Sequence, residues 1–170
     1  ENSISVLASL LLRNQTKEMG KGKLVKWEEN LTFEHVHEPN LQEIIEGATY
    51  MKGEWREKVF GNDNPIVLEL GCGKGEYTIG LARMYPDLNF LGVDAKGHRF
   101  WRGAKTSKKE GLNNVAFLRT RIEFIEAFFA KDEIDEIWLT FSDPQPKNDS
   151  GTKRITGPYF LDRYKNFTKK

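Results

Sequence analysis

Three glycines at alternate positions form the part of the sequence best suited to hold a ligand. Gly71, Gly73 and Gly75 directly follow the apolar run 66–70 and precede a segment, 76–85, with apolar residues at helical spacing. Glycine tolerates positive φ angles and lets a ligand approach the backbone closely. The start of a helix adds unpaired N–H groups and the positive end of the helix dipole. These residues therefore predict a binding loop between a strand and a helix.

Three carboxylates restrict the ligand that this loop can take. Glu76 stands where a dinucleotide-binding G-x-G-x-x-G loop has its last glycine, and its charge would repel a pyrophosphate. Glu69, near the end of the strand, adds a negative charge that favours an ammonium group. Asp94 ends the next predicted strand, where a carboxylate can accept both hydroxyls of a ribose. The combination predicts an adenosine with an amino-acid end, which is S-adenosylmethionine.

Two other interpretations of these residues are open. The glycines can simply make a tight turn, with Asp94 capping a helix. An NAD-dependent oxidoreductase is also conceivable, although Glu76 disfavours it.

Strands and helices alternate around the loop. Short apolar runs predict strands at 66–70, 90–93, 115–118 and 137–141. Apolar residues at helical spacing predict helices at 76–85, 98–110 and 122–130. This order predicts an α/β fold with a mostly parallel sheet, right-handed crossovers and helices on both faces. In such a sheet a ligand binds beyond the carboxyl ends of the strands, where the glycines and Asp94 stand.

The composition excludes several classes of protein. A chain of 170 residues is long enough for one domain with a real core. Its single cysteine, Cys72, excludes an intrachain disulfide and a multi-cysteine zinc site, and its histidines show no metal-ligand spacing. No apolar run approaches the ~20 residues that span a bilayer. We therefore expect a cytoplasmic protein, a monomer or homodimer, with no metal and no membrane partner.

Positive charge is concentrated in two places although the net charge is only +1. The first group is Lys96, Arg99, Arg102, Lys105, Lys108 and Lys109, and the second begins at Lys147 and continues to the last residue. Such groups suit a polyanion such as RNA. The alternative is an ordinary solvated surface.

Longer motifs resemble a known family. "VLELGCGKG" and "FLGVD" are similar to the first two motifs of class I methyltransferases, and "FSDPQPKNDSGTKRI" resembles the signature of the bacterial tRNA (guanine-N7-)-methyltransferases. The resemblance implies a Rossmann-like fold, S-adenosylmethionine as cofactor and tRNA as partner. It also implies methyl transfer to N7 of a guanosine, at position 46 in the variable loop.

The resemblance assigns cofactor-binding residues besides the three glycines. Glu69 matches a cofactor contact and Asp94 matches the ribose-binding acid. Where the family has an acid near the adenine, this chain has Arg121. The adenine contact is therefore expected from backbone groups around Thr120 and Arg121.

The resemblance also assigns catalytic and substrate residues. Asp143 matches the active-site aspartate, which lies beside the cofactor as well. Lys147 matches a substrate-contacting lysine, and Lys153 and Arg154 match part of a basic cluster that faces tRNA. Because guanine N7 carries a free lone pair, Asp143 is expected to orient the base or stabilise its developing charge, without removing a proton.

The domain organisation is expected to be simple. Residues 1–30 read as a flexible basic segment with room for one short helix, and 1–18 as a tag or upstream extension before the start-like "MGKGKL" at Met19. Residues 31–170 then form the methyltransferase domain, C-terminally incomplete relative to the family. Two alternatives to the tRNA enzyme are a methyltransferase for another RNA or a small molecule, and a non-catalytic RNA-binding module with a vestigial methyltransferase fold.

Overall fold

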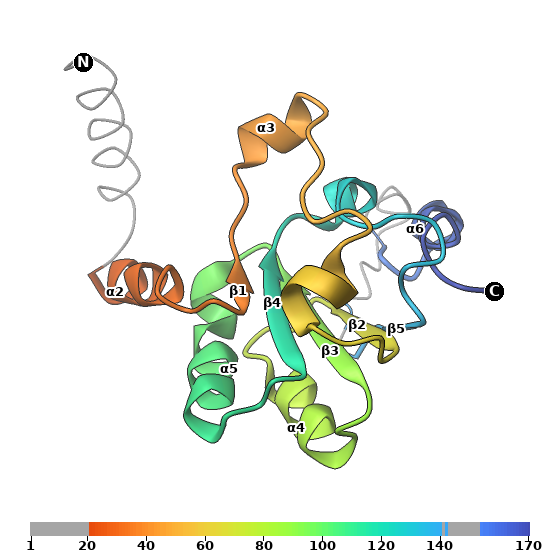
Figure 1. The fold of residues 1–170 in the computed structure, drawn as a ribbon. Helices are drawn as coiled ribbons and strands as arrows, with labels where there is room; N and C mark the ends of the chain where they lie inside the picture. The colour runs from red at the N-terminus through yellow and green to blue at the C-terminus, as the bar shows by residue number, and fades with distance from the viewer. Residues whose placement is uncertain (1–20, 141, 143–153) are drawn as a thin grey trace.

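A computed structural model describes residues 21–140, 142 and 154–170 of the chain (Figure 1). The elements before the central sheet are α2 (Lys21–Asn30), β1 (Val36–His37), α3 (Leu41–Ile45) and the π-helical η1 (Trp55–Phe60). The central elements are β2 (Ile66–Leu70), α4 (Glu76–Met84), β3 (Asn89–Asp94), α5 (Gly97–Glu110) and β4 (Val115–Arg119). The 3₁₀-helical η2 (Ile122–Ala127), β5 (Glu136–Trp138) and α6 (Pro158–Tyr164) follow.

The described strands form one parallel sheet in the order β1-β4-β3-β2-β5. Leu70 at the end of β2 pairs in register with Val93 near the end of β3. Asp94, the last residue of β3, pairs with Arg119 at the end of β4. The predicted α/β fold with a parallel sheet is thus confirmed, and the loops after β2, β3 and β4 leave the sheet at the same edge.

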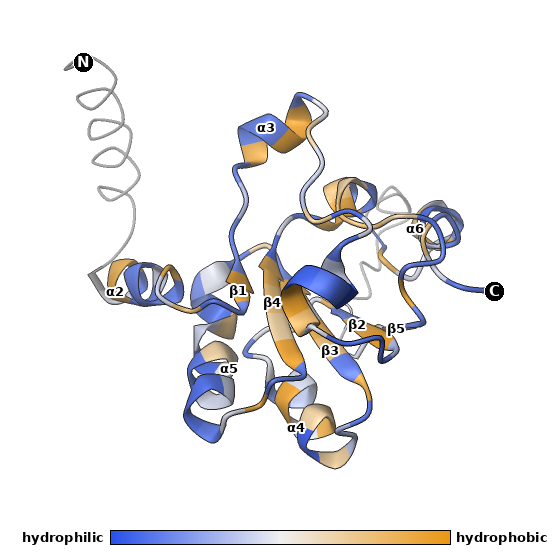
Figure 2. Ribbon diagram, in the orientation of Figure 1, coloured by the Kyte–Doolittle hydropathy of each residue, from blue (hydrophilic) through white to orange (hydrophobic). Residues whose placement is uncertain are grey.

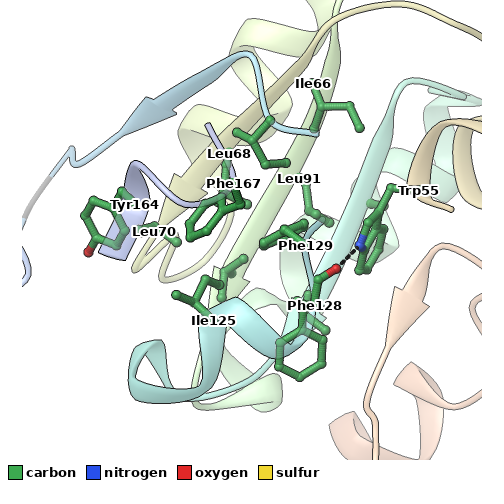
Figure 3. Packing of buried hydrophobic residues seen from close by; sticks show 14 of the residues in the cluster. Trp55, Ile66, Leu68, Leu70, Leu91, Ile125, Phe128, Phe129, Tyr164 and Phe167 are labelled. Atoms are coloured by element: carbon green, nitrogen blue, oxygen red, sulfur yellow. Dashed lines mark hydrogen bonds between the residues drawn. The ribbon is translucent and has the colours of Figure 1, made fainter. Parts of the chain in front are cut away.

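Alternate residues of the strands supply two cores, one on each face of the sheet. On one face, the Phe117 ring of β4 stacks on Phe100 of α5, with ring centroids 5.3 Å apart. On the other face, Leu68 and Leu91 pack with aromatic side chains that include Trp55 (Figure 3). Figure 2 shows the central strands as mostly hydrophobic and much of α5 as hydrophilic, as expected for a helix that covers one face of a sheet.

Three details of the fold differ from the sequence prediction. The third helix is a 3₁₀-helix over Ile122–Ala127, and in this geometry Ile122, Ile125 and Phe128 lie on one side because three residues make one 3₁₀ turn. The fourth strand is shorter than predicted and covers Glu136–Trp138. A fifth strand, β1, has only two residues and is too short to give an alternating pattern.

The buried side of α4 also differs from the apolar pattern that predicts the helix. Tyr77 and Met84 are exposed, whereas Thr78, Ile79 and Ala82 are buried. Thr78 can be buried because its hydroxyl donates a hydrogen bond to a carboxylate of β2.

Helix α2 lies within the segment for which flexibility with at most one short helix was predicted. Its last residue, Asn30, is buried, and its Nδ2 donates hydrogen bonds to Glu38 Oε1 at 3.0 Å and to the Gly97 carbonyl at 3.1 Å. Glu29 accepts a hydrogen bond from Trp101 Nε1 at 2.6 Å. These contacts fix α2 to α5, and the two helices lie side by side in Figure 1.

His37 of β1 is a buried histidine that stays neutral. Its Nδ1 lies 3.0 Å from the Tyr50 hydroxyl, its ring meets Trp55 edge-on, and its Nε2 has no hydrogen-bond partner among the described residues. Burial, with a smaller effect of His35, lowers the pKa of His37 to about 4. The charged form would bury an N–H without an acceptor, which explains the direction of the shift.

We expect the free energy of unfolding to fall as the pH is lowered from the ordinary histidine pKa of 6.5 to about 4. In this range the unfolded chain binds a proton at His37 and the folded chain does not, so protonation favours unfolding, by about 3 kcal/mol over the whole range. Urea unfolding near neutral pH and at about pH 5 measures the effect. A His37→Asn variant lacks the titrating group and should lose less stability between the two pH values. An equal loss in both proteins would contradict the prediction.

Candidate functional site

The glycine loop connects β2 to α4 at the edge of the sheet where Asp94 also lies. Gly71, Gly73 and Gly75 have φ angles of 75°, 56° and 75°, values that residues with side chains rarely adopt. The amides of Gly71 and Cys72 donate hydrogen bonds to the same carbonyl, Val93 O, at 2.8 and 2.9 Å. The end of β3 therefore holds the start of the loop in place.

The three glycines have different surroundings. A Cβ placed on Gly71 or Gly73 would meet nothing within 4 Å, so these two residues face open space. A Cβ on Gly75 would lie 2.7 Å from the Phe117 ring. Gly75 is needed for packing, because α5 also approaches it closely at Gly103. The surface that a ligand can approach is therefore the part of the loop around Gly71 and Gly73.

Glu69 is a buried carboxylate in the middle of the sheet, only 5% exposed. Its two oxygens accept hydrogen bonds from Thr78 Oγ1 at 2.5 Å and from Thr140 Oγ1 at 2.7 Å. Hydroxyl donors of this kind compensate for the loss of water around a buried charge. The two threonines hold Glu69 in one orientation beneath the glycine loop, and the sequence prediction did not include either of them.

Asp94 connects the glycine loop to the start of α5. It is 8% exposed, and its two oxygens accept hydrogen bonds from the amides of Gly73 at 3.1 Å and Lys96 at 2.8 Å. A carboxylate has about four lone-pair positions, so two acceptor positions remain. Asp94 can therefore hold the loop and bind a pair of ligand hydroxyls at the same time.

Thr120 and Arg121 extend this edge to the end of β4. The Thr120 amide donates to the Asp94 carbonyl at 3.2 Å, and the residue is buried. Arg121 is exposed and pairs with Glu123 at 3.1 Å. The structure thus brings Thr120 beside the end of β3, while the Arg121 side chain makes its contact on the outer surface.

The remaining predicted site residues lie in or near the segment after β5. Asp143, Lys147 and Lys153 fall outside the described residues. Arg154 is half-buried, and its carbonyl accepts a hydrogen bond from the Gly157 amide at 2.8 Å in the turn before α6. Among the described residues, no group of His, Cys, Asp or Glu side chains is placed to hold a metal ion, and no helix is long and apolar enough to cross a membrane.

Cys72 lies within the glycine loop as a buried thiol. Burial raises its pKa well above the ordinary value, and the carboxylates of Asp94 and Glu69 raise it further. Only the thiolate reacts readily with alkylating or disulfide reagents. We expect no labelling of Cys72 in the native protein near neutral pH and full labelling in urea. A mass-spectrometric time course measures this, and rapid labelling of the native protein would contradict the packing of the loop.

The part of the chain that forms the site is similar to known methyltransferases. Residues 63–170 match the model of the Methyltransf_4 family, whose description is "Putative methyltransferase". A protein of Christiangramia forsetii named tRNA (guanine-N(7)-)-methyltransferase is 56% identical over 88% of this chain and 66% of its own length. A protein of Bacteroides thetaiotaomicron with the same name is 56% identical over 89% of this chain and 59% of its own length. The chain thus spans less than two thirds of the length of either relative.

Solved structures share the fold at low sequence identity. The antibiotic-resistance methyltransferase Kmr is 18% identical, with a TM-score of 0.53 over 72% of this chain and 62% of its own. A 30S ribosomal A1408 methyltransferase from an uncultured bacterium is 19% identical, with a TM-score of 0.51 over 69% of this chain and 55% of its own. The sheet and the helices around it thus follow an arrangement seen in methyltransferases.

Proposed function

This chain belongs to the Methyltransf_4 family of methyltransferases, and from that premise we propose that it transfers a methyl group from S-adenosylmethionine to N7 of a guanosine in tRNA. The two relatives that are 56% identical carry the name of this activity. The observation that carries the proposal is the open, side-chain-free surface at Gly71 and Gly73 beside the acceptor oxygens of Asp94. A purine nucleoside with an amino-acid end fits that combination.

The residues of the sheet edge suit the parts of this cofactor. Asp94 would accept the ribose hydroxyls with its remaining lone pairs. Glu69 would supply negative charge for the ammonium group. Backbone groups at Thr120 and Arg121 would meet the adenine. Bound there, S-adenosylmethionine supplies an electrophilic methyl group on a sulfonium centre.

The protein's task in the reaction is alignment. The N7 lone pair of guanine would form the bond to the methyl carbon as the carbon–sulfur bond breaks, so no side chain would have to remove a proton. Asp143, which lies outside the described residues, would accept hydrogen bonds from guanine N–H groups or stabilise the positive charge that develops on the purine. It need not act as a general base.

Basic residues after Asp143 would position the substrate. Lys147, Lys153 and Arg154 would bind phosphates of the tRNA, which orients the molecule without selecting the base. The target in this proposal is the guanosine at position 46 of the variable loop. The enzyme would act in the cytoplasm, as a monomer or homodimer.

Transfer of tritium from labelled S-adenosylmethionine to bulk tRNA tests the proposal, with nucleoside mass spectrometry to identify the product. We expect 7-methylguanosine, and loss of the product when Asp143 is changed to alanine. An Asp63→Ala variant removes an exposed carboxylate before β2 and serves as the matched control. Transfer to another base or to a small molecule would identify a different methyltransferase. Binding of tRNA without binding of the cofactor would indicate a non-catalytic RNA-binding module.

A further inference from the structure

A basic groove lies between α2, the glycine loop and α5, outside the cofactor site. It has a volume of about 660 Å³. Its cationic lining residues come from three separate parts of the sequence: Lys26, Lys74, Arg99, Arg102, Lys105 and Lys109. None of the described residues that line the groove is acidic. The fold thus gathers charges that are distant in the sequence.

One end of the groove lies near the sheet edge that holds the cofactor site, because α5 begins three residues after Asp94. The glycine loop meets the groove further along α5, where the Lys74 carbonyl lies beside Gly103. From Arg99 to Lys109 the helix rises by about 15 Å. The groove therefore leads away from the sheet edge that holds the cofactor site, over a length that can follow an extended polyanion.

The charges near the loop are available for a partner. Arg99 and Arg102 are exposed and form no ion pair with any described residue, unlike Lys105, which pairs with Glu29 at 2.8 Å. Lys26 and Lys105 also lie over the Trp101 ring, at 4.9 and 5.0 Å from its centroid.

The surroundings of His98, near the start of α5, show the same excess of positive charge. Partial burial lowers its pKa, and the nearby Lys23, Arg99, Lys26 and Lys96 lower it further. No carboxylate of the described residues is among the groups that shift this pKa. An unneutralised group of cations at a surface attracts anions.

We propose that this groove binds the phosphate backbone of the tRNA beside the nucleotide that is methylated, an inference that rests on the proposed function. A concave surface lined by cations and open along a helix fits a nucleic-acid strand, whose charges are regularly spaced. Arg99 and Arg102 are the principal phosphate ligands, because they are unpaired among the described residues and lie in the first two turns of α5, nearest the sheet edge at which Asp94 ends β3.

The test is the salt dependence of tRNA binding by an Arg99→Gln/Arg102→Gln variant. We expect the affinity to fall at least about tenfold at physiological salt. The slope of log affinity against log salt concentration should become shallower by about 1.4 to 1.8, since each lost phosphate contact contributes about 0.7 to 0.9. Cofactor affinity, measured by calorimetry, should stay unchanged because neither arginine is part of the cofactor site.

A Lys52→Gln/Lys131→Gln variant is the matched control. It removes the same charge from the turn before η1 and from the turn after η2, beside the core on the face of the sheet opposite α5, and should keep the tRNA slope of the unaltered protein. If the unaltered protein methylates tRNA and the arginine variant keeps the same salt slope, the groove does not bind the tRNA backbone. The proposed function would still stand. If the unaltered protein neither binds nor methylates tRNA, the proposed function fails first. The inference is also rejected if the groove binds an acidic protein and the two arginine substitutions leave tRNA binding unchanged.

Discussion

An Asp94→Ala variant is expected to bind S-adenosylmethionine about 100-fold more weakly than the unaltered protein. Removing the carboxylate deletes the proposed ribose acceptor, and hydrogen bonds to a charged group contribute about 1.5–3 kcal/mol each. It also releases the amides of Gly73 and Lys96, which Asp94 holds at 3.1 and 2.8 Å. The loop and the start of α5 then lose a common anchor. Calorimetric titration with the cofactor measures the change.

The control for Asp94 is an acid that lacks these contacts. Asp87 lies exposed in the turn after α4, so Asp87→Ala changes the net charge equally and should leave cofactor affinity unchanged. Thermal unfolding separates affinity from stability in both variants. Cofactor affinity within about threefold of the unaltered value in folded Asp94→Ala would remove Asp94 from the cofactor site, because even one hydrogen bond to a charged group is worth more than that.

A Phe117→Ala variant is expected to lose about 3–5 kcal/mol of unfolding free energy. Phe117 is fully buried and stacks on Phe100 with an angle of 17° between the rings. Its ring also fills the space beside Gly75, Gly92 and Gly103, where added Cβ atoms would come within 2.7 to 2.9 Å of it. Alanine would leave a cavity that these glycines have no side chains to fill.

Urea unfolding measures the effect of Phe117→Ala, and Tyr85→Ala is the matched control. Tyr85 is an aromatic residue that is 47% exposed, so its truncation should cost less than about 1 kcal/mol. If Phe117→Ala does not fold at all, Phe117→Leu retains most of the volume and should give a smaller, measurable loss. Equal stability of Phe117→Ala and the unaltered protein would show that the ring does not support the loop.

The sheet could be predicted from the sequence where the chain has strong local signals. The apolar run of β2 ends directly at a glycine, so the predicted strand 66–70 agrees with Ile66–Leu70 at both ends. Helix α5 has apolar residues on one side and cations on the other, and it ends at Gly111 in a left-handed conformation. By contrast, η2 follows a three-residue spacing that also suits an α-helix, and β1 depends on pairing with β4.

The site could be predicted less completely, because part of it depends on tertiary contacts. The glycines and Asp94 stand next to predicted strand ends, so their proximity follows from a parallel sheet. The contacts of Glu69 with Thr78 and Thr140 depend on how α4 and the segment after β5 pack, which no local pattern reveals. A buried acid within a strand is nevertheless a signal that hydroxyl or amide donors must lie nearby.

The position of Phe117 among Gly75, Gly92 and Gly103 has a consequence for how this protein can evolve. A methyl group added at Gly103 would collide with the aromatic ring and with the Lys74 carbonyl, 2.8 Å away, so it cannot be accepted alone. A smaller side chain at 117 relieves the first collision and leaves the second. Substitutions at these sites should therefore be tolerated only in compensating combinations, in which the backbone around Lys74 also changes. Helix α5 and the glycine loop are thereby constrained to change together during evolution.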